Sequence, residues 1–179
     1  VVFGVAAQIV SEDICSMEDV DRGAKVGLRW AKGPFELMNR LGVSEAYRMA
    51  SAYQQLAGET WNLPEFFEQQ ASNWGFSYVD LHTEGGIATI TINRPEAMNA
   101  LNEVVVEQLT KAVQAANAND AVTTIVLDGA GKAFVAGADV KFFVDKIRSD
   151  SIPDIEVFTE NGHTLLSALE DSDKTTVAL

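Results

Sequence analysis

Apolar residues in the first 75 positions recur at helical spacing. Val2, Val5, Ala6, Ile9 and Val10 form a stripe at intervals of three and four residues, which is typical of an amphipathic helix. Cap and breaker residues predict four more short helices: from Ser16 with Asp19 as a capping box, from Gly33-Pro34 to Gly42, from Ser44 to Gly58, and over 65–72 after Pro64. We therefore expect a small all-α domain over residues 1–75.

The hydrophobic period changes after Gly75. Residues 78–83 and 87–93 flank Glu84-Gly85-Gly86, and the second run alternates Ala88, Ile90 and Ile92 with threonines. This pattern predicts a β-hairpin. Arg94-Pro95 ends the second strand.

A βαβ unit follows the hairpin. Leu101, Val105, Leu109 and Val113 mark one helix face, and 122–127 returns as a strand; such a unit is right-handed by default. Helices over 139–148 and 155–170 and a strand over 175–179 complete the pattern. The fold class expected is multi-domain α and α/β, with domains over 1–75 and 76–179 joined by residues 61–75.

Small residues in the segment 133–141, Ala-Phe-Val-Ala-Gly-Ala-Asp-Val-Lys, predict a tight turn between a buried strand and a helix. Gly137 has no Cβ to oppose the turn. Amide hydrogens at a helix start lack intrahelical acceptors, and the helix dipole adds partial positive charge. The turn is therefore a candidate site for a developing oxyanion.

Composition excludes several functional classes. The net charge of -13 opposes nucleic-acid binding, and the absence of a run of about 18 apolar residues argues against a membrane span. The first residues lack a basic leader and a cleavage site, so we expect no signal peptide. The chain starts without Met, and we expect it to be a piece of a longer protein.

The cysteine and the histidines indicate neither a disulfide nor a metal site. Cys15 is alone, which favours a reducing, cytoplasmic setting and a buried, inert thiol. His82 and His163 are isolated and match no zinc spacing, so we expect surface or packing histidines. The three tryptophans, Trp30, Trp61 and Trp74, are expected to anchor the core or a domain interface.

Three motifs in order carry a resemblance over the second half. They are Gly-Ile-Ala-Thr-Ile-Thr-Ile-Asn-Arg-Pro over 86–95, Met-Asn-Ala-Leu-Asn over 98–102, and the segment 133–141. This half resembles the crotonase family of enoyl-CoA hydratases and isomerases. The resemblance implies the N-terminal part of a crotonase-like ββα spiral domain.

The first half resembles the C-terminal helical domain of 3-hydroxyacyl-CoA dehydrogenases. The resemblance rests on Glu-Asp-Ile at 12–14, Met-Glu-Asp-Val-Asp at 17–21, and the run 27–37, whose Gly-Pro-Phe-Glu core is the specific part. Gly and Pro suit a helix start on backbone grounds, so we expect Phe35 to pack in a core. Together the two halves resemble part of a bifunctional fatty-acid β-oxidation enzyme.

The crotonase resemblance implies roles for particular residues. The Ala138 amide would be the first oxyanion-hole donor to the thioester carbonyl, and Ala136 would lie beside the adenine of coenzyme A. The binding segment would continue through Gly137, Asp139, Val140 and Lys141. Ala97 and Met98 match a second coenzyme A loop, in which Glu96 stands where Lys is common and would repel the diphosphate.

Other parts of both active sites are expected outside this chain. The resemblance places the hydratase carboxylates and the second oxyanion glycine after Leu179. No Gly-x-Gly-x-x-Gly fingerprint occurs, so NAD would bind a separate dehydrogenase domain. Asp139, Asp145, Glu156 and Glu160 are expected to be solvated or capping carboxylates.

Two classes of function remain open at this stage. In the first, the parent enzyme hydrates trans-2-enoyl-CoA and oxidises the 3-hydroxyacyl-CoA with NAD, and an isomerase or hydrolase of the superfamily is a variant of it. In the second, these residues form a non-catalytic dimerisation and acyl-CoA-docking module. We expect an acyl-CoA thioester substrate, no tightly bound cofactor or metal, and a homo-oligomer through both domains.

Two expectations concern the chain by itself. Without the catalytic carboxylates it should hydrate no crotonyl-CoA. Its last strand should also leave an open apolar sheet edge, which is a liability for aggregation.

Overall fold

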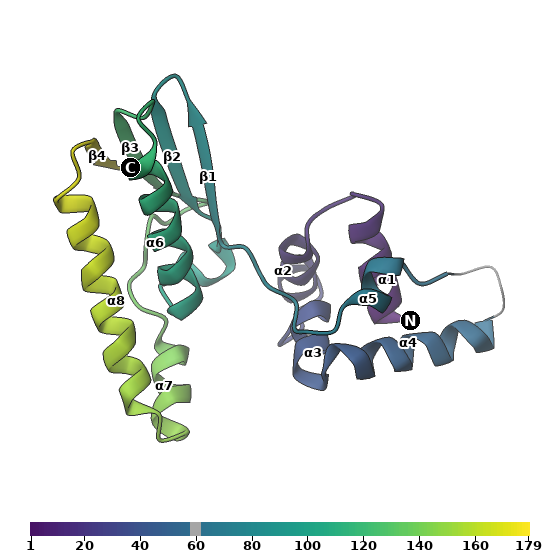
Figure 1. Ribbon diagram of the computed structural model, residues 1–179. Coiled ribbons are helices and arrows are strands. Elements are labelled where there is room, and N and C mark those ends of the chain that lie inside the picture. The colour runs from purple at the N-terminus through teal and green to yellow at the C-terminus, as the bar shows by residue number, and fades with distance from the viewer. Residues whose placement is uncertain (58–61) are drawn as a thin grey trace. The chain divides into compact units, whose positions relative to one another are not determined.

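A computed structural model describes residues 1–57 and 62–179 (Figure 1). The predicted helix end at Gly58 and the predicted anchor Trp61 lie outside the described residues. The chain folds as two compact units, Val1–Phe76 and Ser77–Leu179, the first helical and the second α/β. The fold class expected from the sequence is confirmed.

The first unit consists of short helices around an aromatic core. Its helices are α1 (Val2–Ser11), α2 (Met17–Gly27), α3 (Pro34–Leu41), α4 (Val43–Ala57) and α5 (Glu65–Gln69). Phe35, Met38 and Phe67 are fully buried, and the Trp74 ring packs edge-on against Phe35 with centroids 5.3 Å apart. The predicted core roles of Phe35 and Trp74 are confirmed.

Most predicted helix boundaries in this unit are confirmed. The Ser16 side chain accepts the Asp19 N–H at the start of α2 (3.2 Å). Ser44, however, was wrong as a cap, because α4 already begins at Val43 and Ser44 lies within its first turn. Gly42, with φ +91°, turns the chain directly from α3 into α4, which leaves no room for a separate capping residue. Helix α5 also ends earlier than predicted, at Gln69.

Burial along α1 differs from the predicted stripe. Val2 and Val5 are 43% and 44% exposed, whereas Ala6 and Ala7 are buried, because the neighbouring helices approach α1 over its small side chains. The exposed valines line an apolar hollow of about 470 Å³ between α1 and α2, together with Cys15. Cys15, expected to be buried, is therefore only partly buried.

The second unit is a four-stranded sheet with helices on one face. Its elements are β1 (Val79–Glu84), β2 (Ile87–Ile92), the 3-10 turn η1 (Pro95–Ala97), α6 (Glu103–Ala118), β3 (Thr124–Gly129), α7 (Val140–Arg148), α8 (Ile152–Glu170) and β4 (Thr175–Ala178). The strand order is β1-β2-β3-β4. The β1–β2 hairpin is antiparallel, and β2–β3 and β3–β4 are parallel, as the predicted βαβ unit requires.

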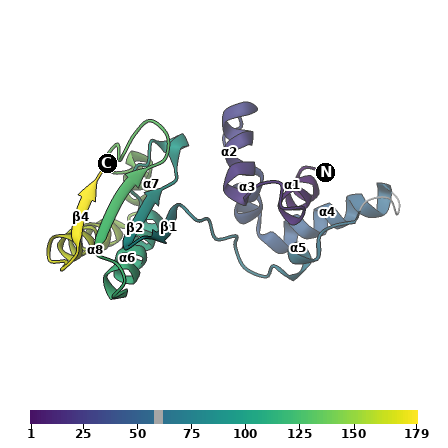
Figure 2. The ribbon, with the colours of Figure 1, turned by 90° about the horizontal axis from the view of Figure 1, so that it is seen from above.

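The core of this unit lies between the sheet and α6. Ala88, Ile90 and Ile92, the alternating residues of β2, are buried against Val105, Leu109 and Val113 of α6. Helix α8 packs beside α6 through Phe158 and Leu165, and Figure 2 shows both helices along one side of the four strands. Leu101, predicted on the α6 face, precedes the helix, because Asn102 caps it (Asn102 Oδ1 accepts the Val105 N–H, 3.0 Å). The last strand, β4, is an edge strand with exposed side chains.

Candidate functional site

The loops after β2 and β3 meet at the carboxyl ends of these parallel strands, where α/β sheets place ligands. The Ala136 N–H donates to the Met98 carbonyl oxygen (3.1 Å), the Leu101 N–H to the Gly137 carbonyl oxygen (2.9 Å), and the Asp139 N–H to the Leu101 carbonyl oxygen (2.8 Å). Leu101 and Ala138 thus form an isolated parallel bridge. The structure therefore brings together the two loops that the sequence assigned to one ligand.

The bridge fixes the direction of the Ala138 amide. In a trans peptide the carbonyl and the next N–H point to opposite sides, and no peptide here is cis. Since the Gly137 carbonyl points at Leu101, the Ala138 N–H points away from it. The described residues offer this N–H no hydrogen-bond acceptor. Ala138 therefore presents one outward donor on an exposed turn.

Gly137 permits this geometry through its backbone conformation. Its φ is +108°, in a region that residues with a Cβ seldom occupy. An added Cβ would meet no atom within 4 Å. The requirement for glycine is therefore conformational and not steric.

Asp139 has two internal partners. Its Oδ1 accepts the Lys141 N–H (3.0 Å) and caps α7, as the sequence analysis expected of a carboxylate at a helix start. Its Oδ2 lies 2.8 Å from Arg94 Nη1, with both side chains largely shielded from water. Asp139 therefore acts within the fold through both oxygens.

Asn99 and Arg94 hold the site together in a way that the sequence did not reveal. Asn99 is fully buried; its Oδ1 accepts the Arg94 N–H (2.9 Å), and its Nδ2 donates to the carbonyls of Ala130 (3.0 Å) and Ala133 (2.7 Å). Its φ of +56° is of a kind that asparagine tolerates better than most residues. An Asn at the turn after a strand was the available signal. One amide thus ties together both loops of the site.

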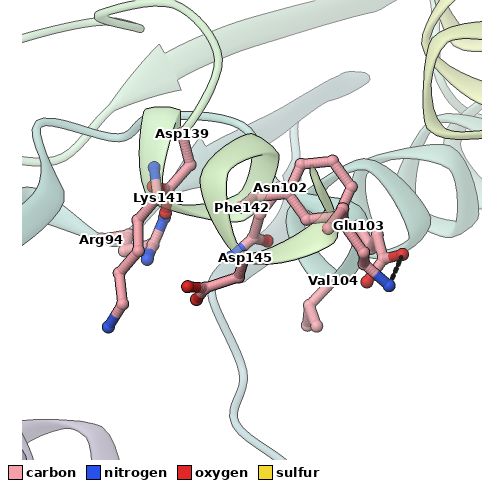
Figure 3. A pocket seen from close by; sticks show the side chains of 9 residues that line it. Arg94, Asn102, Glu103, Val104, Asp139, Lys141, Phe142 and Asp145 are labelled. Carbon is pink, nitrogen blue, oxygen red and sulfur yellow. Dashed lines mark hydrogen bonds and ion pairs between the residues drawn. The ribbon is translucent and has the colours of Figure 1, made fainter. Parts of the chain in front are cut away.

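A cavity of about 290 Å³ opens beside the bridge, between α6 and α7 (Figure 3). Of the predicted site residues, only Asp139 and Lys141 line it; Ala97, Met98, Ala136, Gly137, Ala138 and Val140 do not. Figure 3 shows Lys141 and Asp145 extending outward from α7, whereas Phe142 turns toward Asn102 and Glu103. The cavity and the bridge share Asp139 at their border.

Lys146 crosses the far end of this cavity. Hydrogen bonds to Asp154 (2.7 Å) and Glu103 (2.9 Å) raise the pKa of its ammonium group above the ordinary value of 10.5. This cation joins α7 to α6 and α8 and stays charged at neutral pH. Lys141 is the cation of the cavity that extends toward solvent.

Residues 1–57 and 62–179 contain neither a metal-ligand cluster nor a membrane-spanning helix. No cluster of three or more potential metal ligands occurs there, and His82 and His163 are exposed, as predicted. No helix in this part of the chain has the length and apolar character needed to cross a membrane.

Comparison with known families agrees with this geometry. Residues 87–179, which contain both loops of the bridge, match the enoyl-CoA hydratase/isomerase family. The chain belongs to that family. Residues 2–77 match the C-terminal domain of 3-hydroxyacyl-CoA dehydrogenase, so the two resemblances seen in the sequence are confirmed, in the same order.

Several relatives of the hydratase/isomerase family are similar to parts of the chain. The crotonyl-CoA hydratase of Syntrophomonas wolfei is 34% identical over 104 residues, which are 58% of this chain and 38% of the relative. The short-chain-enoyl-CoA hydratase of Clostridium acetobutylicum is 43% identical over 63 residues, which are 35% of this chain and 24% of the relative. The chain thus spans well under half the length of these relatives.

Solved structures show the same fold in the α/β unit. Pseudomonas aeruginosa PA4980 is 35% identical with a TM-score of 0.52, covering 57% of this chain and 43% of its own. An enoyl-CoA hydratase/carnithine racemase from Magnetospirillum magneticum is 31% identical with a TM-score of 0.52, covering 58% and 39%.

Proposed function

We propose that the α/β unit binds acyl-CoA thioesters and polarises their carbonyl with the Ala138 N–H, as part of an enzyme that hydrates trans-2-enoyl-CoA to 3-hydroxyacyl-CoA. The observation that carries this proposal is the outward, unpartnered Ala138 N–H at the Leu101–Ala138 bridge. A donor held in advance toward the position of a developing oxyanion is a large source of catalysis in acyl chemistry. Membership of the enoyl-CoA hydratase/isomerase family supports the choice of substrate.

The coenzyme A part would lie along the two bridged loops. Ala97 and Met98 on one loop, and residues 136–141 on the other, are the proposed contacts. Their adjacency through the Ala136–Met98 hydrogen bond supports a single groove. Lys141 would meet a phosphate, because its side chain extends toward solvent beside the bridge (Figure 3).

We also propose that the same protein oxidises the hydrated product with NAD, held by a domain other than the two described here. The match of residues 2–77 to the C-terminal domain of 3-hydroxyacyl-CoA dehydrogenase supports this. A homo-oligomer through both units and a cytoplasmic location belong to the same proposal. NADH formation from 3-hydroxybutyryl-CoA tests the oxidation. Sedimentation of the purified protein tests the homo-oligomer.

The experiment that tests the thioester site compares crotonyl-CoA with free coenzyme A, which lacks the carbonyl. Titration calorimetry of this chain should give tighter binding of crotonyl-CoA, and Ala138→Pro, which removes the N–H, should abolish the difference. In a catalytically complete enzyme, loss of one such donor lowers kcat by about 100-fold to 1,000-fold. Equal binding of the two ligands by the unsubstituted chain would contradict the proposal.

Isomerisation is a second candidate chemistry at the same site. The 1,2-epoxyphenylacetyl-CoA isomerase of Escherichia coli is 37% identical over 59 residues, which are 33% of this chain and 22% of that relative. Polarisation of a thioester carbonyl would assist both hydration of an enoyl-CoA and movement of its double bond, because both develop negative charge on that oxygen. Product analysis with trans-2-enoyl-CoA and trans-3-enoyl-CoA separates hydration from movement of the double bond.

A non-catalytic docking module is the alternative of a different class. The observation that favours it is the pairing of two cavity carboxylates, Asp139 with Arg94 and Glu103 with Lys146. A carboxylate that is held by a cation is less available to act as a general base. Hydration of crotonyl-CoA by this chain alone would exclude the docking module. It would also contradict the expectation that the catalytic carboxylates lie elsewhere.

A further inference from the structure

Arg94 touches both loops of the bridge. Its Nη1 lies 2.8 Å from Asp139 Oδ2 and donates to the Ala100 carbonyl oxygen (3.1 Å). The guanidinium carbon lies 5.6 Å from the centroid of the Tyr78 ring. One cation therefore links Tyr78, which precedes strand β1, to the loop after β2 and the start of α7.

The Arg94–Asp139 ion pair is largely shielded from solvent, so it restrains the two side chains more firmly than a surface pair would. The Arg94 and Asp139 side chains are 17% and 16% exposed, so solvent and salt screen their attraction only weakly. Exposed pairs contribute little by comparison. The Lys111–Glu107 pair on α6, with side chains 69% and 65% exposed, is an internal example of the weaker kind.

The Ala138 amide needs such a restraint because of its neighbour. Gly137 has φ +108° and open space around it, so sterics do not hold its flanking peptides, and the Leu101 N–H restrains the Ala138 peptide only through the Gly137 carbonyl. On the other side of Ala138, the Asp139 N–H is held by Leu101 and the Asp139 carboxylate by Arg94. The direction of the Ala138 N–H therefore depends on both hydrogen bonds of the bridge, one at the Gly137 carbonyl and one at Asp139, and Arg94 supports the second.

We propose that Arg94 is a positioning residue for the Ala138 amide and acts through the carboxylate of Asp139. The proposal rests on the proposed thioester site, because it assigns Arg94 the task of aligning that donor. The Asp139 carboxylate then serves catalysis without touching the thioester carbonyl. Its Oδ1 starts α7, and its Oδ2 transmits the position of Arg94 to the adjoining peptide.

The test follows the Ala138 amide by ¹⁵N–¹H NMR while this chain is titrated with crotonyl-CoA or with free coenzyme A. In the unsubstituted chain, crotonyl-CoA should move the Ala138 resonance downfield and coenzyme A should not. Arg94→Met should at least halve this carbonyl-dependent shift. It should also lower the preference for crotonyl-CoA over coenzyme A about tenfold, which is roughly the effect on affinity of losing one hydrogen bond.

Two further variants separate positioning from general destabilisation. Asp139→Asn keeps an oxygen to cap α7 but removes the charge that faces Arg94, and it should reproduce the effect of Arg94→Met. Arg94→Lys keeps the charge and should recover part of the shift. The matched control Lys111→Met, in the exposed pair on α6, should leave both readouts unchanged. If Arg94 had a purely structural role, its substitution would weaken the binding of crotonyl-CoA and of coenzyme A equally, and the ratio of the two affinities would not change.

Each outcome decides one claim. If crotonyl-CoA does not move the Ala138 resonance in the unsubstituted chain, the thioester site is wrong and the positioning role falls with it. If it does, but Arg94→Met and Asp139→Asn keep the full shift and the full preference, the positioning role alone is wrong. If Arg94→Met fails to fold, judged by loss of exchange protection at Ile90, Asp139→Asn carries the same test.

Discussion

At the scale of single residues, Asp21 shows how a distant side chain replaces a missing cap. Gly33 precedes α3 and has no side chain to accept the first helical N–H groups. The buried Asp21 carboxylate accepts them instead, from Phe35 (2.8 Å) and Glu36 (2.9 Å). A Cβ on residue 33 would overlap the Asp21 side chain. Glycine at position 33 is therefore required by the acid that caps the helix.

Asp21→Ala should lower the free energy of unfolding of the helical unit by about 2–3 kcal/mol, because two buried N–H groups lose their acceptor. Urea denaturation followed by tryptophan fluorescence measures this change. Glu45→Ala, which breaks an exposed pair with Arg48 on α4, is the control and should leave the midpoint unchanged. A loss no larger than that of the control would show that Asp21 is not the cap.

Glu36 makes the same unit sensitive to acid. Burial alone would raise its pKa, but the hydrogen bond from the Gly33 N–H and the nearby Lys25 together hold the pKa below the ordinary 4.5. A lowered pKa contributes stability above pH 4.5 that is lost as the pH falls through the folded-state value. Burial raises the pKa of Asp21 above 3.8, so its contribution has the opposite sign and is lost as the pH rises.

Glu36→Gln should therefore reduce the loss of unfolding free energy between pH 5 and about pH 3. Gln can still accept the Gly33 N–H but does not titrate. Urea midpoints measured across this range test the change, with Glu12→Gln, at an exposed site on the same unit, as the control. If the urea midpoint of the variant falls as steeply below pH 5 as that of the unsubstituted chain, groups other than Glu36 cause the pH dependence.

At the scale of elements, local sequence signals predicted most helix and strand boundaries, whereas contacts between residues far apart in the sequence were not predicted. Ser16 and Asp139 each cap the helix that follows them, and a cap acts within three residues, so the sequence reveals it. Asn102 acts over the same short range, but the apolar pattern that begins at Leu101 placed the helix start one residue before this cap. Besides the nearby Arg94 N–H, which Asn99 accepts, Asp21 and Asn99 bind backbone groups 14 to 34 residues away. No sequence period reports such a contact, which is why the turn was predictable and the residues that hold it were not.

Two glycines of the α/β unit should respond oppositely to alanine. Gly137→Ala should cost about 1–3 kcal/mol in unfolding free energy because of its positive φ. Gly162 lies inside α8, and a Cβ added there would meet no atom within 4 Å. Gly162→Ala should therefore raise the unfolding free energy by up to about 1 kcal/mol. Urea denaturation followed by circular dichroism measures both. Equal effects of the two substitutions would remove the conformational argument for Gly137.

At the scale of the whole molecule, the two units have separate cores and separate optical probes. All three tryptophans lie in Val1–Phe76, so their fluorescence reports the helical unit alone, whereas circular dichroism reports both. We expect the two probes to give transitions that do not coincide, which departs from two-state unfolding. Asn99→Ala should shift only the dichroism transition, and Asp21→Ala should shift the fluorescence transition. Coincident curves in both variants would indicate one cooperative unit.

The Leu101–Ala138 bridge also bears on the order of folding. It joins residues 37 positions apart and closes beyond the ends of β2 and β3. The entropy of closing that loop is offset mainly by the pairing of the two strands and their burial under α6. Nascent chains should therefore acquire the sheet first and the outward amide last. The Ala138 donor is then a local marker of completed folding, and a collapsed intermediate would have a core but no thioester site.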